Sequence, residues 1–156
     1  MRDATTSSGV PSPRDPRTPG DGGGRTGDRP ALSMVIPCYN EALRLPGTVR
    51  EIASFCAGFG RPCEVVLVDD GSRDDTRSAI LQAARDHDFV RPVLLPRNRG
   101  KGAALREGVG TTTGSVVVFF DADLAYPLST VGAALREIEA GADLVIGARD
   151  LGRAAD

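Results

Sequence analysis

Several stretches of this chain are continuously apolar, and two of them end in paired acidic residues. Val65 to Val68 is followed by Asp69 and Asp70, and Val116 to Phe120 is followed by Asp121-Ala122-Asp123. Continuous valine-rich runs are typical of strands in a parallel sheet, because helices cover both faces of such a sheet. Unpaired charge is costly at a buried strand end. The two acidic endings therefore predict a site at the carboxyl edge of a parallel sheet, where ligands bind in α/β folds.

Strand and helix signals alternate along the chain. Apolar runs predict five strands: Leu32 to Pro37, Cys63 to Val68, Val90 to Leu95, Ser115 to Phe120 and Ala142 to Ile146. Pro92 lacks a ladder donor, so the third strand is expected at an edge. Apolar residues at helical spacing predict helices in between, over Val49 to Phe59, around Ile80, over Lys101 to Glu107 and over Val131 to Ile138. This order predicts a three-layer α/β/α fold with a mostly parallel sheet.

The first 29 residues differ in composition from the rest. Met1 to Arg29 contain six Gly, four Pro, five Arg and four Asp, with almost nothing apolar. Such a segment buries too little surface to offset its chain entropy. We therefore predict a disordered tail over residues 1–29 and one domain over residues 30–156. The tail's arginines alternate with aspartates and the net charge is −2, so no nucleic-acid partner is indicated.

Cysteine usage and hydropathy bear on the compartment. Cys38, Cys56 and Cys63 are odd in number and lack C-x-x-C spacing, so they are predicted to be reduced core residues of a cytosolic protein. No apolar run approaches the length of a membrane span, and no signal-peptide core is present near the start. Peripheral contact with a membrane stays open.

Asp121-Ala122-Asp123 has a D-x-D pattern, which alone carries little information in a chain with 15 Asp. A second copy, Asp86-His87-Asp88, lies between a predicted helix and the next strand and is typical of a solvated helix end. The first copy differs because five apolar residues precede it. Two carboxylates there can hold Mg²⁺ or Mn²⁺, ions that also accept phosphate oxygens. Capping of the following helix by Asp123 is the alternative.

Two further segments carry polar groups at the same predicted edge. Asp69-Asp70-Gly71-Ser72 can form a cap and a turn, but two successive aspartates also suit hydrogen bonds from a base or ribose. Gly100-Lys101-Gly102 combines a flexible backbone with a cation at a helix start, which suits a phosphate. Lys101 is the single lysine beside 18 arginines. A solvated turn lysine is the alternative. His87 is the single histidine, so neither a Ser-His-Asp hydrolase nor a histidine metal site is indicated.

Four ordered motifs resemble those of family 2 glycosyltransferases with the GT-A fold. They are Val35-Ile36-Pro37-Cys38-Tyr39-Asn40-Glu41, Val68-Asp69-Asp70-Gly71-Ser72-Arg73-Asp74-Asp75-Thr76, Asn98-Arg99-Gly100-Lys101-Gly102 and Asp121-Ala122-Asp123-Leu124. The last motif and the closing Val145-Ile146-Gly147-Ala148-Arg149 are similar to those of polyprenyl- or dolichyl-phosphate sugar synthases. The resemblance implies a Rossmann-like nucleotide-binding core, here without the C-terminal part of the family's domain.

The resemblance also implies roles for individual residues. Asp121 and Asp123 would hold Mg²⁺ or Mn²⁺ and the donor diphosphate, with the Ala122 backbone against the nucleotide. Asp69, together with Asp70, would read the base or ribose. The other implied donor-site residues are Pro37, Tyr39, Glu41, Lys101 and Arg149. The implied reaction is inverting transfer of a sugar from a GDP- or UDP-sugar to a polyprenyl phosphate or glycan, with the metal stabilising the departing diphosphate.

Members of this family continue well beyond the position of Arg149, whereas this sequence ends at Asp156. The resemblance assigns acceptor contacts and the catalytic base to that further segment, so no base is predicted here. A non-catalytic or remnant nucleotide-sugar-binding module is the alternative function. A receiver-like signalling domain needs an aspartate pair after its first strand, where this chain has Pro-Cys-Tyr-Asn-Glu. The implied location is the cytoplasm, either free or at the cytoplasmic membrane face beside a membrane or membrane-protein partner.

Overall fold

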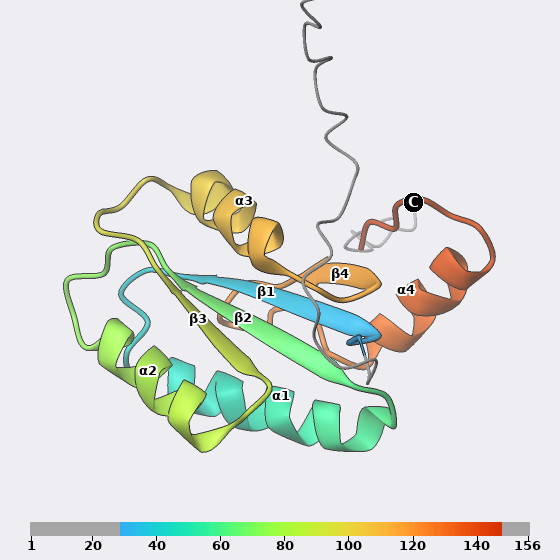
Figure 1. The fold of residues 1–156 in the computed structure, drawn as a ribbon, viewed down its shortest axis with the longest axis horizontal. Helices are drawn as coiled ribbons and strands as arrows, with labels where there is room; N and C mark the ends of the chain where they lie inside the picture. Colours follow the sequence, from blue (N-terminus) through green and yellow to red (C-terminus); the bar gives the residue numbers. More distant parts are fainter. Residues whose placement is uncertain (1–28, 148–156) are drawn as a thin grey trace, which may run out of the picture.

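The computed structural model describes residues 29–147, and Figure 1 shows their arrangement. Four parallel strands form one sheet in the order β3-β2-β1-β4. The strands are β1 (Leu32–Cys38), β2 (Cys63–Asp69), β3 (Val90–Leu94) and β4 (Val116–Phe119). The helices are α1 (Leu45–Phe59), α2 (Thr76–Asp86), α3 (Lys101–Thr111) and α4 (Thr130–Glu139). The edge position predicted for the proline-containing strand β3 is confirmed.

Alternate side chains of the central strands enter two separate cores. Met34 and Leu67 belong to the larger core, which also contains buried residues of α1, α2 and α4. Val35 and Val66 point to the other face and pack against Ala104 of α3. Figure 1 shows α1 and α2 on one side of the sheet and α3 on the other. The predicted three-layer arrangement is therefore confirmed, and period-two alternation within continuous apolar runs is what fills both cores.

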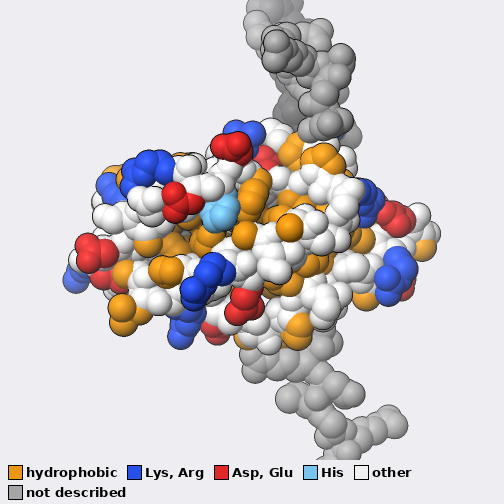
Figure 2. All heavy atoms as spheres, turned by 90° about the horizontal axis from the view of Figure 1, so that it is seen from below, with side chains coloured by type: hydrophobic (Ala, Val, Ile, Leu, Met, Phe, Trp, Pro, Cys, Tyr) orange, Lys and Arg blue, Asp and Glu red, His pale blue; other side chains and the backbone are white. Residues whose placement is uncertain are grey.

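The surface over the α1 and α2 layer carries charges of both signs. In Figure 2, which views the molecule from below, acidic and basic side chains are scattered among hydrophobic ones and form no single-sign patch on this face. Across residues 29–147, no helix combines the length and the apolar character needed to cross a membrane.

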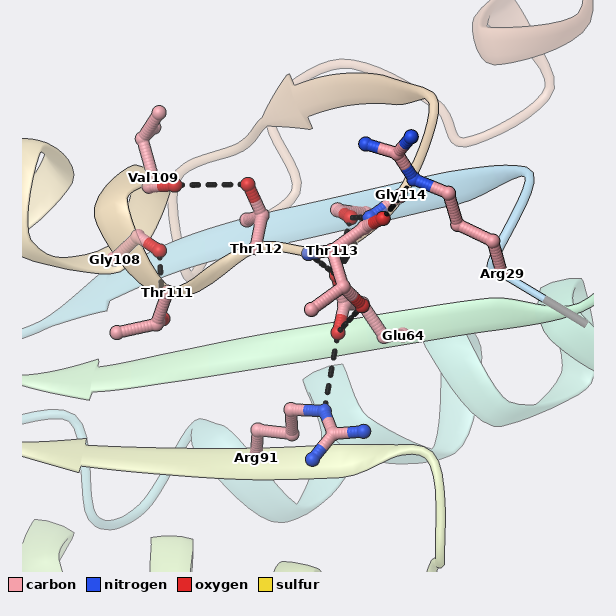
Figure 3. Close-up of polar contacts among 10 residues, drawn as sticks. Arg29, Glu64, Arg91, Gly108, Val109, Thr111, Thr112, Thr113 and Gly114 are labelled. Carbon is pink, nitrogen blue, oxygen red and sulfur yellow. Dashed lines mark hydrogen bonds and ion pairs between the residues drawn. The ribbon is translucent and has the colours of Figure 1, made fainter. Parts of the chain in front are cut away.

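Residues 1–28 of the predicted tail lie outside the described residues. Arg29, the last residue of that tail, donates its Nε–H to the Thr113 carbonyl at 2.6 Å (Figure 3).

Helix α3 is longer than predicted, and a glycine explains why. The sequence places two glycines after Glu107, which disfavours continuation of a helix. In the structure Gly108 faces the sheet, where an added Cβ would lie 2.5 Å from Val35 Cγ1 and 2.8 Å from Val68 Cγ2. The missing side chain lets α3 pack closely against β1 and β2, and that packing outweighs the weak helix propensity.

The predicted fifth strand over Ala142 to Ile146 is wrong. Residues 142–147 form no strand, and Leu144 and Ile146 are more than 70 % exposed, at 73 % and 78 %. A strand requires a neighbour for its backbone groups, and this segment pairs with none of the described strands. Among residues 29–147, β4 is the last strand on its side of the sheet. Its Val117 and Phe119, which by register lie on the same face as Val35, are exposed. The apolar composition of this run predicted a strand, but its side chains are not buried and its backbone pairs with no strand among residues 29–147.

The buried carboxylate of Glu64 links neighbouring strands near their amino ends, at the edge of the sheet where the parallel strands begin (Figure 3). Glu64 of β2 is 2 % exposed and accepts hydrogen bonds from Ser33 Oγ at 2.5 Å, Thr113 Oγ1 at 3.0 Å and Gly114 N at 3.0 Å. The Thr113 backbone N–H is a further donor, and Arg91 Nε of β3 lies 3.0 Å away. Burial raises the pKa of Glu64, but the hydrogen bonds from Ser33, Thr113 and Gly114 outweigh burial and hold the pKa below its ordinary value.

Candidate functional site

A cleft of about 430 Å³ opens at the carboxyl edge of the sheet. Its lining comes from the end of β1 and the loop after it, the residue after β2, the loop before α3 with the start of that helix, and the segment after β4. The predicted site residues that line it are Pro37, Tyr39, Glu41, Asp70, Lys101, Asp121, Ala122 and Asp123. Gly100, of the predicted Gly100-Lys101-Gly102 segment, also lines it, as do Cys38, Arg44 and Asn98, to which the sequence assigned no role in the site. Asp69 lies behind the wall of the cleft, and Arg149 lies outside the described residues.

The D-x-D segment after β4 presents its two carboxylates outward. Ala122 is 4 % exposed, and its carbonyl accepts a hydrogen bond from Thr48 Oγ1 of α1 at 2.5 Å. Asp121 and Asp123 on either side are exposed. The chain then turns through Leu124 at φ +48°, a conformation unusual for a bulky side chain, with Leu124 N donating to the Asp121 carbonyl. Burial of the middle residue therefore fixes both aspartates at the mouth of the cleft.

Asp123 is exposed but also accepts one local hydrogen bond. Its Oδ1 accepts a hydrogen bond from Ala125 N at 3.1 Å, so the carboxylate closes a turn. The alternative prediction, capping of the following helix, does not describe this contact, because α4 begins only at Thr130.

The donor atoms in the cleft suit a cation that is held jointly with a ligand. The described part of the chain has no group of three or more His, Cys, Asp or Glu able to hold a metal by themselves. Mg²⁺ commonly takes one or two protein carboxylates and completes its shell with waters and phosphate oxygens. Asp121 and Asp123 supply two exposed carboxylates beside the cleft. The residues therefore fit a divalent ion that bridges to a diphosphate, and they do not form a complete cage.

Asp69 has protein donors on both carboxylate oxygens. It is 1 % exposed, and its Oδ1 accepts a hydrogen bond from Ser72 N at 2.9 Å. Its Oδ2 lies 3.2 Å from Arg77 Nε of α2, and Arg77 Nη2 also donates to the Leu95 carbonyl at 3.1 Å. Asp69 therefore holds the turn after β2 against α2 and the end of β3.

Asp70 fixes the loop that leads into α3. Its Oδ1 accepts a hydrogen bond from Arg99 N and its Oδ2 accepts one from Gly100 N, both at 2.8 Å. The next residue, Gly71, has φ +65°, and a Cβ there would lie 2.3 Å from the Arg97 carbonyl carbon. The loop before α3 thus passes directly over a glycine and is tied to the adjacent carboxylate.

Lys101 is the first residue of α3 and forms an ion pair with Asp121 Oδ1 across the cleft. Both side chains are about half exposed, at 56 % and 53 %. The sequence predicted a cation at this helix start, but it gave no indication that Asp121 is its partner. The contact joins the β2-to-α3 side of the cleft to the β4 side.

The loop after β1 completes the cleft wall. Glu41 Oε2 pairs with Arg44 Nη1 at 2.8 Å, and Glu41 N donates to Thr76 Oγ1 at 2.7 Å. Arg44 lies three residues after Glu41, which is the spacing of neighbours in a helical turn and was the available signal for it. Burial, followed by the charges of Glu41 and Asp69, raises the pKa of Cys38 to about 12. The Cys38 thiol is therefore protonated at neutral pH and is no nucleophile.

The three cysteines form no disulfide and lie in or against the larger core. Cys38, Cys56 and Cys63 are free cysteines, as predicted. Burial, with a smaller effect of Cys63, raises the pKa of Cys56 to about 12. These thiols are core or near-core groups, and only Cys38 lines the cleft.

Comparison with known proteins gives consistent relatives. The family model described as "Glycosyl transferase family 2" matches residues 33–155. The chain is 43% identical over 122 residues to an undecaprenyl-phosphate 4-deoxy-4-formamido-L-arabinose transferase of Pseudomonas paraeruginosa, covering 76% of this chain and 35% of that protein. The chain thus spans about a third of that relative's length, since the share is 35%.

Solved structures show the same fold. The mannosyltransferase PcManGT from Pyrobaculum calidifontis, in complex with GDP-Man and Mn²⁺, has a TM-score of 0.57 and 31% identity, covering 75% of this chain and 34% of that one. Glucosyl-3-phosphoglycerate synthase from Mycobacterium tuberculosis has a TM-score of 0.56 and 27% identity, covering 72% and 40%. The predicted Rossmann-like GT-A core is thereby confirmed. Because the family match covers most of the sequence, the chain belongs to glycosyl transferase family 2.

Proposed function

We propose that the cleft binds a nucleotide-sugar donor, and that the protein transfers the sugar, with inversion, to a polyprenyl phosphate. The observation that carries the proposal is that two exposed carboxylates, Asp121 and Asp123, line the cleft together with Lys101, which pairs with Asp121. This arrangement places cation ligands and a cation where a diphosphate can reach both. The PcManGT complex with GDP-Man and Mn²⁺ supports the donor class and the metal. The undecaprenyl-phosphate transferase relative supports the acceptor class.

Each part of the cleft has a proposed task. Asp121 and Asp123 would hold Mg²⁺ or Mn²⁺, which would supply positive charge beside the departing nucleoside diphosphate. Lys101, at the N-terminus of α3, attracts the donor phosphates. The nucleoside lies along Pro37, Tyr39 and Glu41, and its base or ribose is read near Asp69 and Asp70. Arg149 is a further proposed phosphate contact.

The proposed acceptor needs little activation by the protein. A lipid phosphate is already anionic, so its oxygen can attack the anomeric carbon without a strong base. The leaving nucleoside diphosphate takes the electron pair of the broken glycosidic bond. A lipid acceptor also implies that the transfer takes place at the cytoplasmic face of a membrane, beside a membrane or membrane-protein partner.

The donor proposal is tested by isothermal titration of the full chain with GDP and UDP, each with and without MnCl₂. We expect metal-dependent binding of at least one nucleotide. Asp123→Ala should weaken that binding at least about tenfold, because it removes one of two charged metal ligands. Asp86→Ala is the matched control, since Asp86 belongs to the other D-x-D, at the end of α2. The absence of binding by both nucleotides with metal present would refute the proposal.

A non-catalytic nucleotide-sugar-binding module is the second candidate, because the roles proposed for the residues that line the cleft are all donor-side roles. The two candidates differ in turnover. Radiolabelled sugar donors incubated with the full chain and a membrane extract would give more labelled lipid than the extract without the chain only if the chain transfers sugar by itself. Metal-dependent nucleotide binding without any labelled lipid or glycan would favour the module.

A further inference from the structure

We propose that Lys101 is a built-in counter-cation for the metal site. Without metal, its ammonium neutralises Asp121, and when a divalent ion binds Asp121, Lys101 is released toward the phosphates of the donor. This inference rests on the donor-binding function proposed above, and it adds a specific exchange of partners within that cleft. The Lys101 side chain would thus first pair with Asp121 and then contact the donor phosphates.

In the first step of the exchange, the Lys101 ammonium and the divalent ion compete for Asp121 Oδ1. Lys101 Nζ pairs with Asp121 Oδ1, and a carboxylate oxygen engaged by an ammonium is less available to a divalent ion. Both side chains are about half exposed, so the pair is accessible to solvent ions and can open without unfolding. Exposed pairs of this kind are weak, which allows a divalent cation to replace the ammonium.

The position of Lys101 is built by the surrounding chain. Asp70 is 3 % exposed and binds Arg99 N and Gly100 N, the two backbone donors immediately before Lys101. The loop before them passes over Gly71, where a Cβ would lie 2.3 Å from the Arg97 backbone. These contacts fix the start of α3 at the cleft, so only the flexible lysine side chain has to move. Asp70 is therefore a positioning residue for Lys101.

The residue type also fits the exchange. All other basic side chains in the sequence are arginines, 18 of them, and this position alone has lysine. Arginine forms planar two-point contacts with carboxylates, whereas lysine is a compact point charge on a flexible stem. A lysine is thus held less firmly by Asp121 and can turn to a phosphate.

The exchange predicts opposite effects of one substitution on two ligands. Lys101→Met removes the competitor of the metal, so Mn²⁺ alone should bind more tightly, by about three- to tenfold for a half-exposed charge. The same substitution removes a phosphate contact, so the nucleotide in the presence of saturating Mn²⁺ should bind more weakly, by a similar factor. A residue with a purely structural role would weaken both affinities together.

The experiment uses the full chain and four proteins: wild type, Lys101→Met, Lys101→Arg and Arg99→Met. Free Mn²⁺ is followed by electron paramagnetic resonance during titration with MnCl₂ alone, and GDP and UDP are then titrated calorimetrically at saturating MnCl₂. Arg99→Met is the matched control, because Arg99 also carries one positive charge in this loop but pairs with Glu107 at 2.9 Å. We expect Arg99→Met to stay within twofold of wild type in both titrations. Lys101→Arg should bind Mn²⁺ no more tightly than wild type.

The outcomes separate this inference from the proposed function. Tighter Mn²⁺ binding by Lys101→Met, with weaker nucleotide binding, supports the exchange. An Mn²⁺ affinity of Lys101→Met that equals or falls below wild type overturns it, even where the wild type binds nucleotide with metal. Equal gains in Lys101→Met and Arg99→Met also overturn it, because they would reflect net charge alone. Failure of the donor function would instead appear as loss of nucleotide binding in the wild type.

Discussion

Glu64 offers a quantitative test of what holds this sheet together. Its carboxylate accepts hydrogen bonds from residues on β1 and on the turn before β4, and pairs with Arg91 on β3. We consider Glu64→Gln, which keeps the shape of the side chain and removes its charge. Oε1 alone receives Ser33 Oγ, Thr113 N and Gly114 N.

The cost follows from these contacts. Hydrogen bonds to a charged group contribute about 1.5–3 kcal/mol, against about 0.5–1.5 kcal/mol for neutral ones. The difference is about 1–1.5 kcal/mol per bond, so losing charge assistance on the three Oε1 bonds costs about 3–4.5 kcal/mol in the free energy of unfolding. The Arg91 pair adds little, because the Arg91 side chain is 59% exposed and its charge is screened by solvent. The expected loss is a large share of the roughly 5–15 kcal/mol typical of a domain.

The assay is urea unfolding of the wild type and Glu64→Gln at pH 7, with the midpoint and the slope fitted separately. Glu107→Gln is the matched control, because Glu107 pairs with Arg99 at a half-exposed position, and we expect a change within about 0.5 kcal/mol. A Glu64→Gln protein within about 0.5 kcal/mol of wild type, with an unchanged slope, would refute this account of the cluster.

The pH dependence gives a second check on Glu64. Its pKa in the folded protein is lowered from the ordinary value of 4.5. A carboxyl with a depressed folded-state pKa stabilises the protein above the unfolded-state pKa, and this stabilisation is lost as pH falls through the folded-state pKa. The stability difference between wild type and Glu64→Gln should therefore be full at pH 7 and shrink below about pH 4.5. A difference that stays constant down to pH 3 would contradict a charged Glu64 as its source.

Two other substitutions test the packing that shapes the cleft. Gly108→Ala should lower the midpoint of thermal unfolding, at a cost of about 1–3 kcal/mol, because its Cβ would meet Val35 and Val68, whereas Gly110→Ala in the same helix has open space and should stabilise by up to about 1 kcal/mol. If both glycine variants gain stability, the close approach of α3 to the sheet is wrong. Thr48→Val should weaken Mn²⁺-dependent nucleotide binding about three- to tenfold, because it frees the Ala122 carbonyl that orients both aspartates. Thr111→Val removes a comparable bond inside α3 and should leave the titrated affinity unchanged.

The sequence was informative wherever burial follows from local pattern. Continuous apolar runs located β1, β2, β3 and β4, and Pro92 placed β3 at an edge, because a missing donor is a property of one residue. The end of α3 and the fifth strand were mispredicted for the opposite reason. Gly108 is tolerated because of side chains from β1 and β2, and the run Ala142 to Ile146 lacks a strand partner among residues 29–147. Both outcomes depend on contacts between distant segments.

The same distinction applies to the candidate site. The parallel topology was sufficient to predict that residues after β1, β2 and β4 meet at one edge. It could not predict Thr48, whose hydroxyl reaches Ala122 from a different element. It also could not predict that Lys101 pairs with Asp121, because such a contact depends on the path of the loop before α3.

The two acidic strand ends differ in what their carboxylates can still bind. Asp69 and Asp70 are buried, and each has protein donors on both oxygens, so any ligand must share those oxygens or displace a donor that also shapes the cleft. Asp121 and Asp123 are exposed. Asp121 pairs with Lys101, whose side chain is itself about half exposed and has a flexible stem. A cation can exchange with a lysine at far lower cost than a ligand can replace buried backbone donors. Ligand-dependent change in this cleft is therefore expected on the β4 side, while the β2 side keeps its internal contacts and acts as the template against which the donor is placed.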